Sequence, residues 1–339
     1  MDKAGIAGIG VYIPNNFWTS KEIAKKSGLP EWVVKDKLGI VRKPMPGPDD
    51  HPSVMGTKAA VEALKMANCD PLDIDVLIWN GSQYKDYPIW LAGTKVANNI
   101  GATKAWSFDM EAECGSMIVG MKLAKDMIRA DSKINTVLLV SGYRNCDFVN
   151  YSNPKTRFLN DIGAGGAAMI IKRNAPNEIL ESSVITDGSF SEDVVVPMGG
   201  SKEPWTCEGL KAGRQYLDVP APESMKERLD AVSMDNFIGV IKESTQLSGY
   251  SVSDIDYLAI LHMKRSAHET VINGLKISPE KTIYLENYGH LGQNDQVLSM
   301  YLALKSGKIK KGDLVVTVGA GIGYIWAATS ILWMQEGLK

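Results

Sequence analysis

The sequence predicts an α/β fold of five layers, in the order helix, sheet, helix, sheet, helix, with two mixed, mostly parallel sheets. Two observations predict it. Short apolar runs alternate with amphipathic stretches across short connections, which is typical of parallel strands covered by helices. Several of these segments also recur at a nearly constant spacing, which indicates that one α/β unit is present twice. The two middle helices, one from each unit, are expected to pack back to back.

The repeat is visible in four pairs of segments, whose members lie about 180 residues apart. They are Asp73-Ile74-Asp75 with Asp254-Ile255-Asp256, 106–109 with 282–285, the segments that contain Cys114 and His290, and 136–140 with 314–318. We expect a duplicated, thiolase-like architecture with a first half over residues 1–173, carrying the cysteine, and a second half over 174–339, carrying the histidines.

The first half begins with a strand and then alternates helices and strands. Thr19 or Ser20 can cap the first helix, which carries Glu22 in its first turn. Gly101 is the expected stop of a helix that begins at Trp90. The predicted strands are 4–12, 76–79, 106–109, 136–140 and 167–171, and the predicted helices are 20–26, 30–37, 53–67, 90–100 and the stretch that starts at Cys114.

The second half repeats this pattern after a long insertion. Residues 188–213 are rich in glycine and have few periodic apolar positions, so we expect a surface loop with some strand. A helix is predicted over 224–248, and strands follow at 257–261, 282–285 and 314–318 before the repeat ends near Ile331.

The composition fits a globular protein with an ample core, since 45% of the 339 residues are hydrophobic and 22% are charged. A net charge of −2 and the lack of a long basic run argue against nucleic-acid binding. A local basic patch of Lys35, Lys37, Arg42 and Lys43 can still meet a phosphate-bearing partner.

No apolar run approaches the about 18 residues of a membrane span, and the N-terminal residues lack the pattern of a signal peptide. Four cysteines are scattered without a Cys-x-x-Cys pair, so neither a disulfide framework nor a metal site is expected. Free thiols in a reducing cytoplasm are the simplest interpretation.

Cys114 is the first candidate for chemistry. It follows a predicted strand and opens a helix whose Met117, Met121, Ala124 and Ile128 share one apolar face. The positive end of the helix dipole favours a thiolate there, and the free N–H groups of the first turn can hold an oxyanion. The alternative is an inert core cysteine, which is the commonest fate of a free cysteine.

Two histidines strengthen the case for Cys114. His262 ends one predicted strand, and His290 follows another. Ligands of parallel sheets collect at the carboxyl ends of strands, so both rings are expected to lie opposite the cysteine. His51, in a proline-rich loop, and His268, expected to be exposed on the next helix, are weaker candidates.

Short motifs are spread along the chain in a fixed order. They read GIGVYIP (8–14), LGIVR (38–42), DMEAECGSM (109–117), NDIGAGGAA (160–168), LH (261–262), NYGH (287–290) and GAGIGY (319–324). In order and spacing they resemble the thiolase-fold condensing enzymes, and most closely the β-ketoacyl-acyl-carrier-protein synthase III family. The resemblance covers nearly the whole length.

The resemblance implies a two-stage acyl transfer. Cys114 would take an acyl group from a thioester, while the backbone N–H groups of Cys114 and Gly321 bind the carbonyl oxygen. A second, malonyl-type thioester would then be activated beside His262 and His290 and attack the acyl-enzyme to give a β-ketoacyl product. The resemblance also implies fatty acid or polyketide biosynthesis, with coenzyme A or acyl-carrier-protein thioesters as substrates and no permanently bound cofactor.

Three residues bear on the places where this sequence departs from the family pattern. His290 stands where synthase III proteins usually carry asparagine, and it can act as a general base as well as a donor to an enolate. Glu113 replaces a small neutral residue and would disfavour the Cys114 thiolate if it points inward. A solvent-facing or dimer-interface position is the alternative for Glu113. Asp295 can orient one histidine, or it can simply start a helix.

Four residues are assigned to substrate binding from the resemblance. Trp32 matches the position that stacks on the adenine of coenzyme A, with a packed aromatic as the alternative. Arg157 resembles a phosphate-contacting arginine, although its spacing to Asp161 is shorter than usual. Tyr87 matches the loop that the partner subunit inserts into the acyl pocket of family homodimers. Trp90 narrows that pocket, which favours a short acyl group.

The leading hypothesis is therefore a cytoplasmic, homodimeric acyltransferase that works through an acyl-Cys114 intermediate. Among enzymes the alternative is a non-decarboxylative relative: a hydroxymethylglutaryl-coenzyme A synthase-like condensation, or acyl transfer to an alcohol or amine. Outside enzymes the alternative is a subunit whose site has decayed and which supports a partner. The joint presence of Cys114, His262 and His290 argues against decay.

Overall fold

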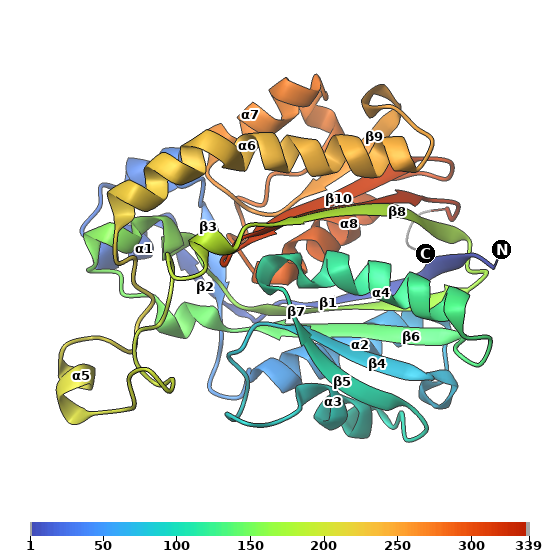
Figure 1. The fold of residues 1–339 in the computed structure, drawn as a ribbon, viewed down its shortest axis with the longest axis horizontal. Coiled ribbons are helices and arrows are strands. Elements are labelled where there is room, and N and C mark those ends of the chain that lie inside the picture. Colours follow the sequence, from blue (N-terminus) through green and yellow to red (C-terminus); the bar gives the residue numbers. More distant parts are fainter. Residues whose placement is uncertain (1, 337–339) are drawn as a thin grey trace.

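The computed structural model describes residues 2–336 and contains one nine-stranded sheet with helices packed against it (Figure 1). The strand order is β5-β4-β6-β7-β1-β8-β11-β10-β9, and β2 pairs with β3 in a separate small sheet. The strands are β1 (Ala4–Tyr12), β2 (Asn16–Thr19), β3 (Arg42–Met45), β4 (Val76–Gly81), β5 (Trp106–Glu111), β6 (Thr136–Tyr143), β7 (Gly165–Arg173), β8 (Asn177–Thr186), β9 (Ile255–Ile260), β10 (Leu314–Gly321) and β11 (Ile325–Leu332).

Eight α-helices accompany these strands in the described part of the chain. They are α1 (Ser20–Ser27), α2 (Pro52–Ala67), α3 (Ala92–Ile100), α4 (Ser116–Ala130), α5 (Cys207–Lys211), α6 (Pro222–Leu247), α7 (Arg265–Leu275) and α8 (Asp295–Lys305). No helix between residues 2 and 336 has the length and apolar character needed to cross a bilayer.

The sheet consists of two halves joined by a short contact between β1 and β8. These strands pair at only two positions, Gly5 with Glu178 and Ile6 with Asn177. In the first half β1, β4, β5 and β6 run in one direction and β7 runs against them. In the second half β8, β9 and β10 run together and β11 runs against them. The prediction of mixed, mostly parallel sheets is confirmed, and the two sheets touch at one edge.

The helices complete five layers. α4 and α8 lie between the half-sheets, where Met121 and Met300 belong to one core that includes residues of both halves. α2 and α3 cover the outer face of the first half, and α6 and α7 cover that of the second half (Figure 1). Each buried aliphatic side chain of these cores contributes about 1.5 to 3 kcal/mol. The predicted layer order, with the two middle helices back to back, is confirmed.

The two half-sheets follow the same path. In chain order and in space, β4, β6, β7 and β1 of the first half correspond to β9, β10, β11 and β8 of the second. β7 ends at Arg173, and β8, which belongs to the second half, begins at Asn177. We propose that the two copies divide into residues 1–173 and 174–339.

The outermost strand of the first half, β5, has no counterpart in the second half. The prediction of a strand over 282–285 is wrong, because this segment forms no ladder with β9 in the structure. Its neighbour Glu286 instead uses its carbonyl oxygen to accept the backbone N–H groups of Val41 and Arg42, 2.7 and 3.3 Å away. The repeat therefore comprises four strands in each half, and the second half lacks a strand that would correspond to β5.

Local signals place most of the other elements correctly. Thr19 caps α1 in a reciprocal capping box with Glu22, as predicted. α3 stops at Gly101, whose φ of 79° suits glycine in the left-handed region. The predicted helices 53–67, 90–100 and 224–248 correspond to α2, α3 and α6 within two residues at each end.

Two segments differ from expectation. Residues 30–37 do not form a regular α-helix but end in a wide, π-helical turn over Val33–Lys37. The backbone N–H of Leu38 donates a hydrogen bond to the carbonyl oxygen of Val33 and closes this turn. The long insertion is mostly loop, as predicted, but its only strand-like pairing within the described residues is a bridge between Val195 and Asp218. It also contains the short helix α5, which projects from the body of the molecule (Figure 1).

Candidate active site

The candidate nucleophile lies at the start of a middle-layer helix. β5 ends at Glu111, a short turn covers Glu113–Gly115, and α4 begins at Ser116. Cys114 is 6% exposed and sits in this turn, so the first N–H groups of α4 and the positive end of its dipole lie next to it. The Ser116 hydroxyl accepts the N–H of Ala112 at 2.8 Å, which fixes the turn before the helix.

His290 is in direct contact with the cysteine. Its Nε2 lies 3.1 Å from Sγ of Cys114, and its Nδ1 lies 2.6 Å from Oδ2 of Asp295, the first residue of α8. Burial lowers the pKa of His290, but the nearby Cys114 and Asp295 outweigh burial and hold the pKa well above its ordinary value. The ring can therefore hold the proton of the thiol and leave a thiolate beside it.

His262 lies in the same cavity but bonds to other groups. Its Nδ1 is 3.1 Å from Oδ2 of Asp161, and its Nε2 is 3.3 Å from the carbonyl oxygen of Gly39. Its backbone N–H donates to Oδ2 of Asp295 at 2.8 Å. His262 and His290 are thus tied together through one carboxylate, and only His290 is hydrogen-bonded to Cys114.

Gly321 lies against the backbone of the nucleophile, at the end of β10. A Cβ atom built on Gly321 would stand 2.8 Å from the backbone nitrogen of Cys114 and 2.9 Å from Cβ of Glu113. Only glycine permits this approach without a shift. The backbone of Gly321 therefore lies directly against the backbone nitrogen of Cys114.

A cavity of about 550 Å³ contains these groups and leads away from them along α6. Cys114, His262 and His290 form one part of its wall. The rest is mostly apolar, with three lysines, two carboxylates and two hydroxyl groups: Phe158, Leu159, Pro222, Met225, Leu229, Met234, Phe237, Leu261, Met263, Ala267, Ala320, Gly321, Ile322, Lys155, Lys226, Lys264, Asp161, Asp230, Ser233 and Tyr324. We call this the nucleophile cavity. Its mainly apolar lining suits a flexible, mainly apolar chain.

The four residues predicted to bind substrate do not line the nucleophile cavity. Trp32 is 57% exposed and lies before the turn at Val33–Lys37. Arg157 is exposed on the segment Pro154–Asp161, where the neighbouring Lys155 lines the cavity instead. Tyr87, which is 65% exposed, packs edge-on against Trp90 with ring centroids 5.6 Å apart. Their assignment to substrate binding stays a prediction.

Glu113 points away from the nucleophile cavity. It is partly buried and lines a different hollow, together with Ser82 and Asn145. Burial, and then the charge of Glu111, raise the pKa of Glu113 to about 7. Its φ of 46° lies in the left-handed region that favours glycine, so the backbone is strained immediately before the nucleophile.

Lys43 belongs to the site although the sequence placed it in a surface patch. Lys35, Lys37 and Arg42 are exposed, but Lys43 is fully buried, and that expectation is wrong. Its Nζ donates to the Tyr151 hydroxyl at 2.7 Å and to the carbonyl oxygens of Asn160 and Ile162 at 2.8 and 2.6 Å. Burial lowers the pKa of Lys43 to about 8, and Cys146 and Asp161 partly counter that effect.

The turn that Lys43 holds touches both histidines. The carboxylate of Asp161 is hydrogen-bonded to Nδ1 of His262. The backbone carbonyl oxygen of Asp161 accepts a hydrogen bond from the backbone N–H of His290 at 3.0 Å. Asp161 and Lys43 were not predicted as functional residues. The only sequence signal for Asp161 is an acidic side chain just before a glycine-rich turn, and Lys43 gives no signal at all.

The other histidine of this region is structural. His268 is 5% exposed and packs edge-on against Tyr284, so the expectation of an exposed ring is wrong. Burial, and then the charges of His262 and Arg265, lower the pKa of His268 to about 4. α7 turns this ring toward the sheet because Val271, Ile272 and Leu275 share its buried face.

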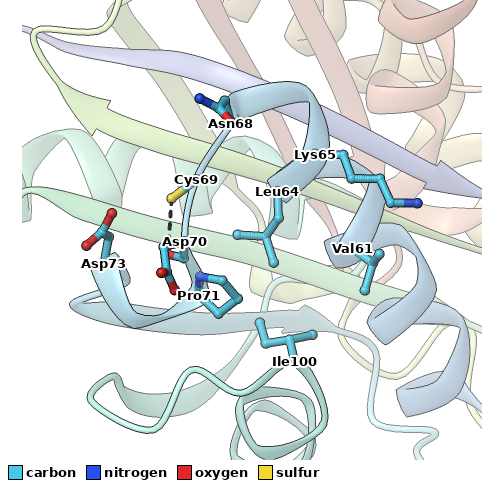
Figure 2. Close-up of a pocket in the computed structure, with 9 residues that line it drawn as sticks. All are labelled: Val61, Leu64, Lys65, Asn68, Cys69, Asp70, Pro71, Asp73 and Ile100. Atoms are coloured by element: carbon cyan, nitrogen blue, oxygen red, sulfur yellow. Dashed lines mark hydrogen bonds between the residues drawn. The ribbon is translucent and has the colours of Figure 1, made fainter.

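The remaining cysteines lack an imidazole partner. Cys69 lines a shallow surface groove at the end of α2, where its Sγ lies 3.5 Å from the carbonyl oxygen of Asp70 (Figure 2). Burial raises the pKa of Cys146 to about 12, and Cys207 is exposed on α5. Within residues 2–336, Cys114 is the only cysteine that is hydrogen-bonded to a histidine.

Two family models match the chain. The one described as 3-oxoacyl-[acyl-carrier-protein] synthase III matches residues 108–188, and the one for the C-terminal part of the same enzyme matches residues 245–333. Together they cover half of the sequence. The first spans Cys114 and Asp161, and the second spans His262, His290 and Asp295.

Whole-length relatives agree with these matches. The chain is 26% identical to the β-ketoacyl-[acyl-carrier-protein] synthase III of Symbiobacterium thermophilum, over 97% of this chain and 98% of that protein. The 3-oxoacyl-[acyl-carrier-protein] synthase III structure from Aquifex aeolicus superimposes with a TM-score of 0.83 at 22% identity, over 97% of this chain and all of that one. The priming β-ketosynthase of the R1128 polyketide pathway gives 0.85 at 20% identity, over 98% and 97%. At such identities the two structures establish the shared fold.

Proposed function

Since the chain belongs to the 3-oxoacyl-[acyl-carrier-protein] synthase III family, we propose that it is a condensing acyltransferase in which Cys114 carries the acyl group. The observation that supports this assignment most strongly is the 3.1 Å contact between Sγ of Cys114 and Nε2 of His290 in the wall of a cavity. Acyl thioesters of coenzyme A or of a carrier protein are the proposed substrates. The mainly apolar lining of the nucleophile cavity supports such a ligand.

In the first stage, His290 takes the thiol proton of Cys114 and the sulfur attacks the thioester carbonyl. The backbone N–H groups of Cys114 and Gly321 stabilise the oxyanion that forms on the carbonyl oxygen. When the tetrahedral intermediate collapses, the bond to the carrier sulfur breaks and the carrier thiolate receives the proton from His290. The acyl group then remains on Cys114.

In the second stage, a malonyl-type thioester loses carbon dioxide, and the resulting enolate attacks the acyl carbon. Cys114 leaves as a thiolate, and the product is a β-ketoacyl thioester. His262 would donate a hydrogen bond from Nε2 to the enolate oxygen, and His290 would add a second one when its Nε2 carries a proton. At 3.3 Å the bond of His262 Nε2 to the carbonyl of Gly39 is long, so it can be exchanged for a substrate oxygen at little cost.

One observation favours a second reaction. Asp295 holds His290 with Nε2 directed at Cys114, and a histidine in that arrangement can also remove a proton from carbon, oxygen or nitrogen. The second candidate is therefore a non-decarboxylative transfer, either a condensation of the hydroxymethylglutaryl-coenzyme A synthase type or acylation of an alcohol or amine.

We also propose that the protein is a cytoplasmic homodimer. Exposed apolar side chains lie in the short segment between β4 and α3: Tyr87, Ile89 and Leu91, which are 65%, 105% and 52% exposed. Such a group on one monomer is typical of a protein interface. Four free cysteines support a reducing compartment.

Intact-mass measurement tests the assignment. The protein, Cys114→Ala and the matched control Cys207→Ala are each incubated with a panel of acyl-coenzyme A thioesters. We expect the acyl mass increment on the unsubstituted protein and on Cys207→Ala, and none on Cys114→Ala. An equal increment on Cys114→Ala would overturn the assignment. Release of carbon dioxide from malonyl thioesters by the acylated enzyme then separates the two candidate reactions.

A further inference from the structure

A second cavity of about 510 Å³ lies on the other side of the nucleophile turn. Glu113 lines this cavity, whereas Cys114, the next residue, lines the nucleophile cavity. Among the described residues, Ile322 alone lines both. The two spaces therefore meet at Ile322, in the turn between β10 and β11, and at the backbone of residues 113–114 they lie on either side of the chain.

The lining of the second cavity has a polar end and an apolar end. The polar side chains come from the ends of β4 and β6 and from the nucleophile turn, and the apolar side chains come mainly from the long insertion. They are Ser82, Gln83, Tyr84, Glu113 and Asn145, and Phe148, Val194, Val196, Met198, Trp205 and Leu217. This arrangement suits an apolar chain that carries one polar group.

Glu113 is the ionisable group of this lining whose side chain makes no hydrogen bond or ion pair within residues 2–336. Ser82 already donates to Asn145 at 3.0 Å, and the Tyr84 hydroxyl donates to Asp147 at 3.2 Å. The carboxyl of Glu113 makes no hydrogen bond or ion pair with any residue between 2 and 336. A partly buried carboxyl without a donor is unfavourable, and it lies on a backbone that favours glycine. Both features leave it ready to accept a hydrogen bond from a ligand.

We propose that Glu113 selects, among acyl chains that are carried by Cys114 and enter this cavity, those bearing a hydrogen-bond donor, a hydroxyl or an ammonium group. The inference rests on the proposed acyl-Cys114 intermediate. The carrier arm occupies the nucleophile cavity and the carbonyl oxygen faces the N–H groups of Cys114 and Gly321, so the acyl chain must leave in a different direction. The space beyond Ile322, lined by the residue next to Cys114, has room for such a chain.

Matched acyl-coenzyme A pairs test the selection. The acylation of Cys114 is followed by intact mass with hexanoyl-coenzyme A, with its chain-hydroxylated isomers and with 6-aminohexanoyl-coenzyme A. We expect at least one donor-bearing chain to give a kcat/KM about tenfold above that of hexanoyl. Glu113→Met is similar in size but has no hydrogen-bond acceptor, so it is expected to remove or invert this preference. Glu113→Gln keeps an acceptor and is expected to keep part of the preference. Glu227→Gln, an exposed position on α6, is the control.

The outcomes separate the selection from the reaction. Equal kcat/KM values for every pair, or a preference that persists in Glu113→Met, would overturn the role of Glu113 while hexanoyl still forms an adduct on Cys114. A missing adduct with every thioester would overturn the proposed function together with this inference. Ile322→Ala gives an independent readout, because a wider passage should speed acylation by longer chains more than by acetyl. An unchanged chain-length profile would contradict the path through Ile322.

Discussion

Asp295 Oδ2 lies 2.6 Å from Nδ1 of His290 and 2.8 Å from the backbone nitrogen of His262, so one carboxylate fixes both histidines. Its Oδ1 accepts the N–H of Leu291 at 2.7 Å. Asp295 is fully buried. Because it is the first residue of α8, its carboxylate lies at the positive end of the helix dipole, which is favourable for a negative charge. An acceptor at Nδ1 keeps a proton on that nitrogen and leaves Nε2 free to accept the thiol proton of Cys114.

Asp295→Asn is expected to slow acylation of Cys114 by two orders of magnitude or more, an effect of the size seen when a triad carboxylate is neutralised. The amide can donate to Nδ1 of His290, which places the ring proton on Nε2, the atom that must accept. Loss of the negative charge also lowers the pKa of His290 toward its ordinary value. The measurement is the rate of Cys114 alkylation by iodoacetamide at neutral pH. Asp126→Asn, a surface position on α4, is the control, and equal rates in both variants would contradict the role of Asp295.

His290→Asn separates the two candidate reactions. Asparagine keeps a donor for an enolate oxygen but cannot take a proton. If His290 serves as a base in the second stage, the variant already acylated on Cys114 should still release carbon dioxide from malonyl thioesters, while proton abstraction from a non-decarboxylating second substrate falls at least tenfold. Product analysis by mass spectrometry checks both reactions. If neither rate changes, His290 is a bystander to the second stage.

Local sequence patterns predicted the parts of the site that depend on one element. Cys114 at a helix start follows from an apolar strand and an amphipathic helix on either side of it. The order of layers follows from the alternation of elements and from the repeat. The repeat predicted the side of the sheet on which His290 lies, because His290 occupies the position in the second copy that Cys114 occupies in the first. That prediction is correct, although the strand expected before His290 does not form.

The remaining features depend on contacts between distant segments. Lys43 approaches the turn at Asn160 and Ile162 only because β3 packs beside that turn, and a single basic residue among others gives no sign of burial. The bonds of His262 to Asp161 and Gly39 join residues 101 and 223 positions apart, so its ring direction cannot be inferred from its own strand. His268 was judged by its neighbours in sequence, whereas Tyr284 buries it.

Lys43→Met is expected to lower both stability and activity. The variant keeps the volume but leaves the carbonyl oxygens of Asn160 and Ile162 without their donor, which should reduce the free energy of unfolding by about 2 kcal/mol. The turn that aligns His262 and His290 would loosen, so acylation should slow even where the protein is fully folded. Urea unfolding and acylation rates are compared with Lys37→Met, an exposed neighbour. Equal stability of the two variants would show that the buried contacts of Lys43 contribute nothing net.

Glu113→Gln is expected to reduce the loss of stability that the protein undergoes as pH rises from about 4.5 to about 7. The folded state raises the pKa of Glu113 from 4.5 to about 7, so between these values it binds more protons than the unfolded state does. The contribution of this group to stability therefore falls as pH rises from about 4.5 to about 7, and it stays reduced above pH 7. Each pKa unit corresponds to about 1.4 kcal/mol, so the full effect is about 3 kcal/mol or less. Urea unfolding at pH 5 and pH 8 should show the substitution to be stabilising at pH 8 and nearly neutral at pH 5. The same difference at both pH values would mean that the carboxyl is ionised throughout, and Glu227→Gln, which lies on the surface, should change neither measurement.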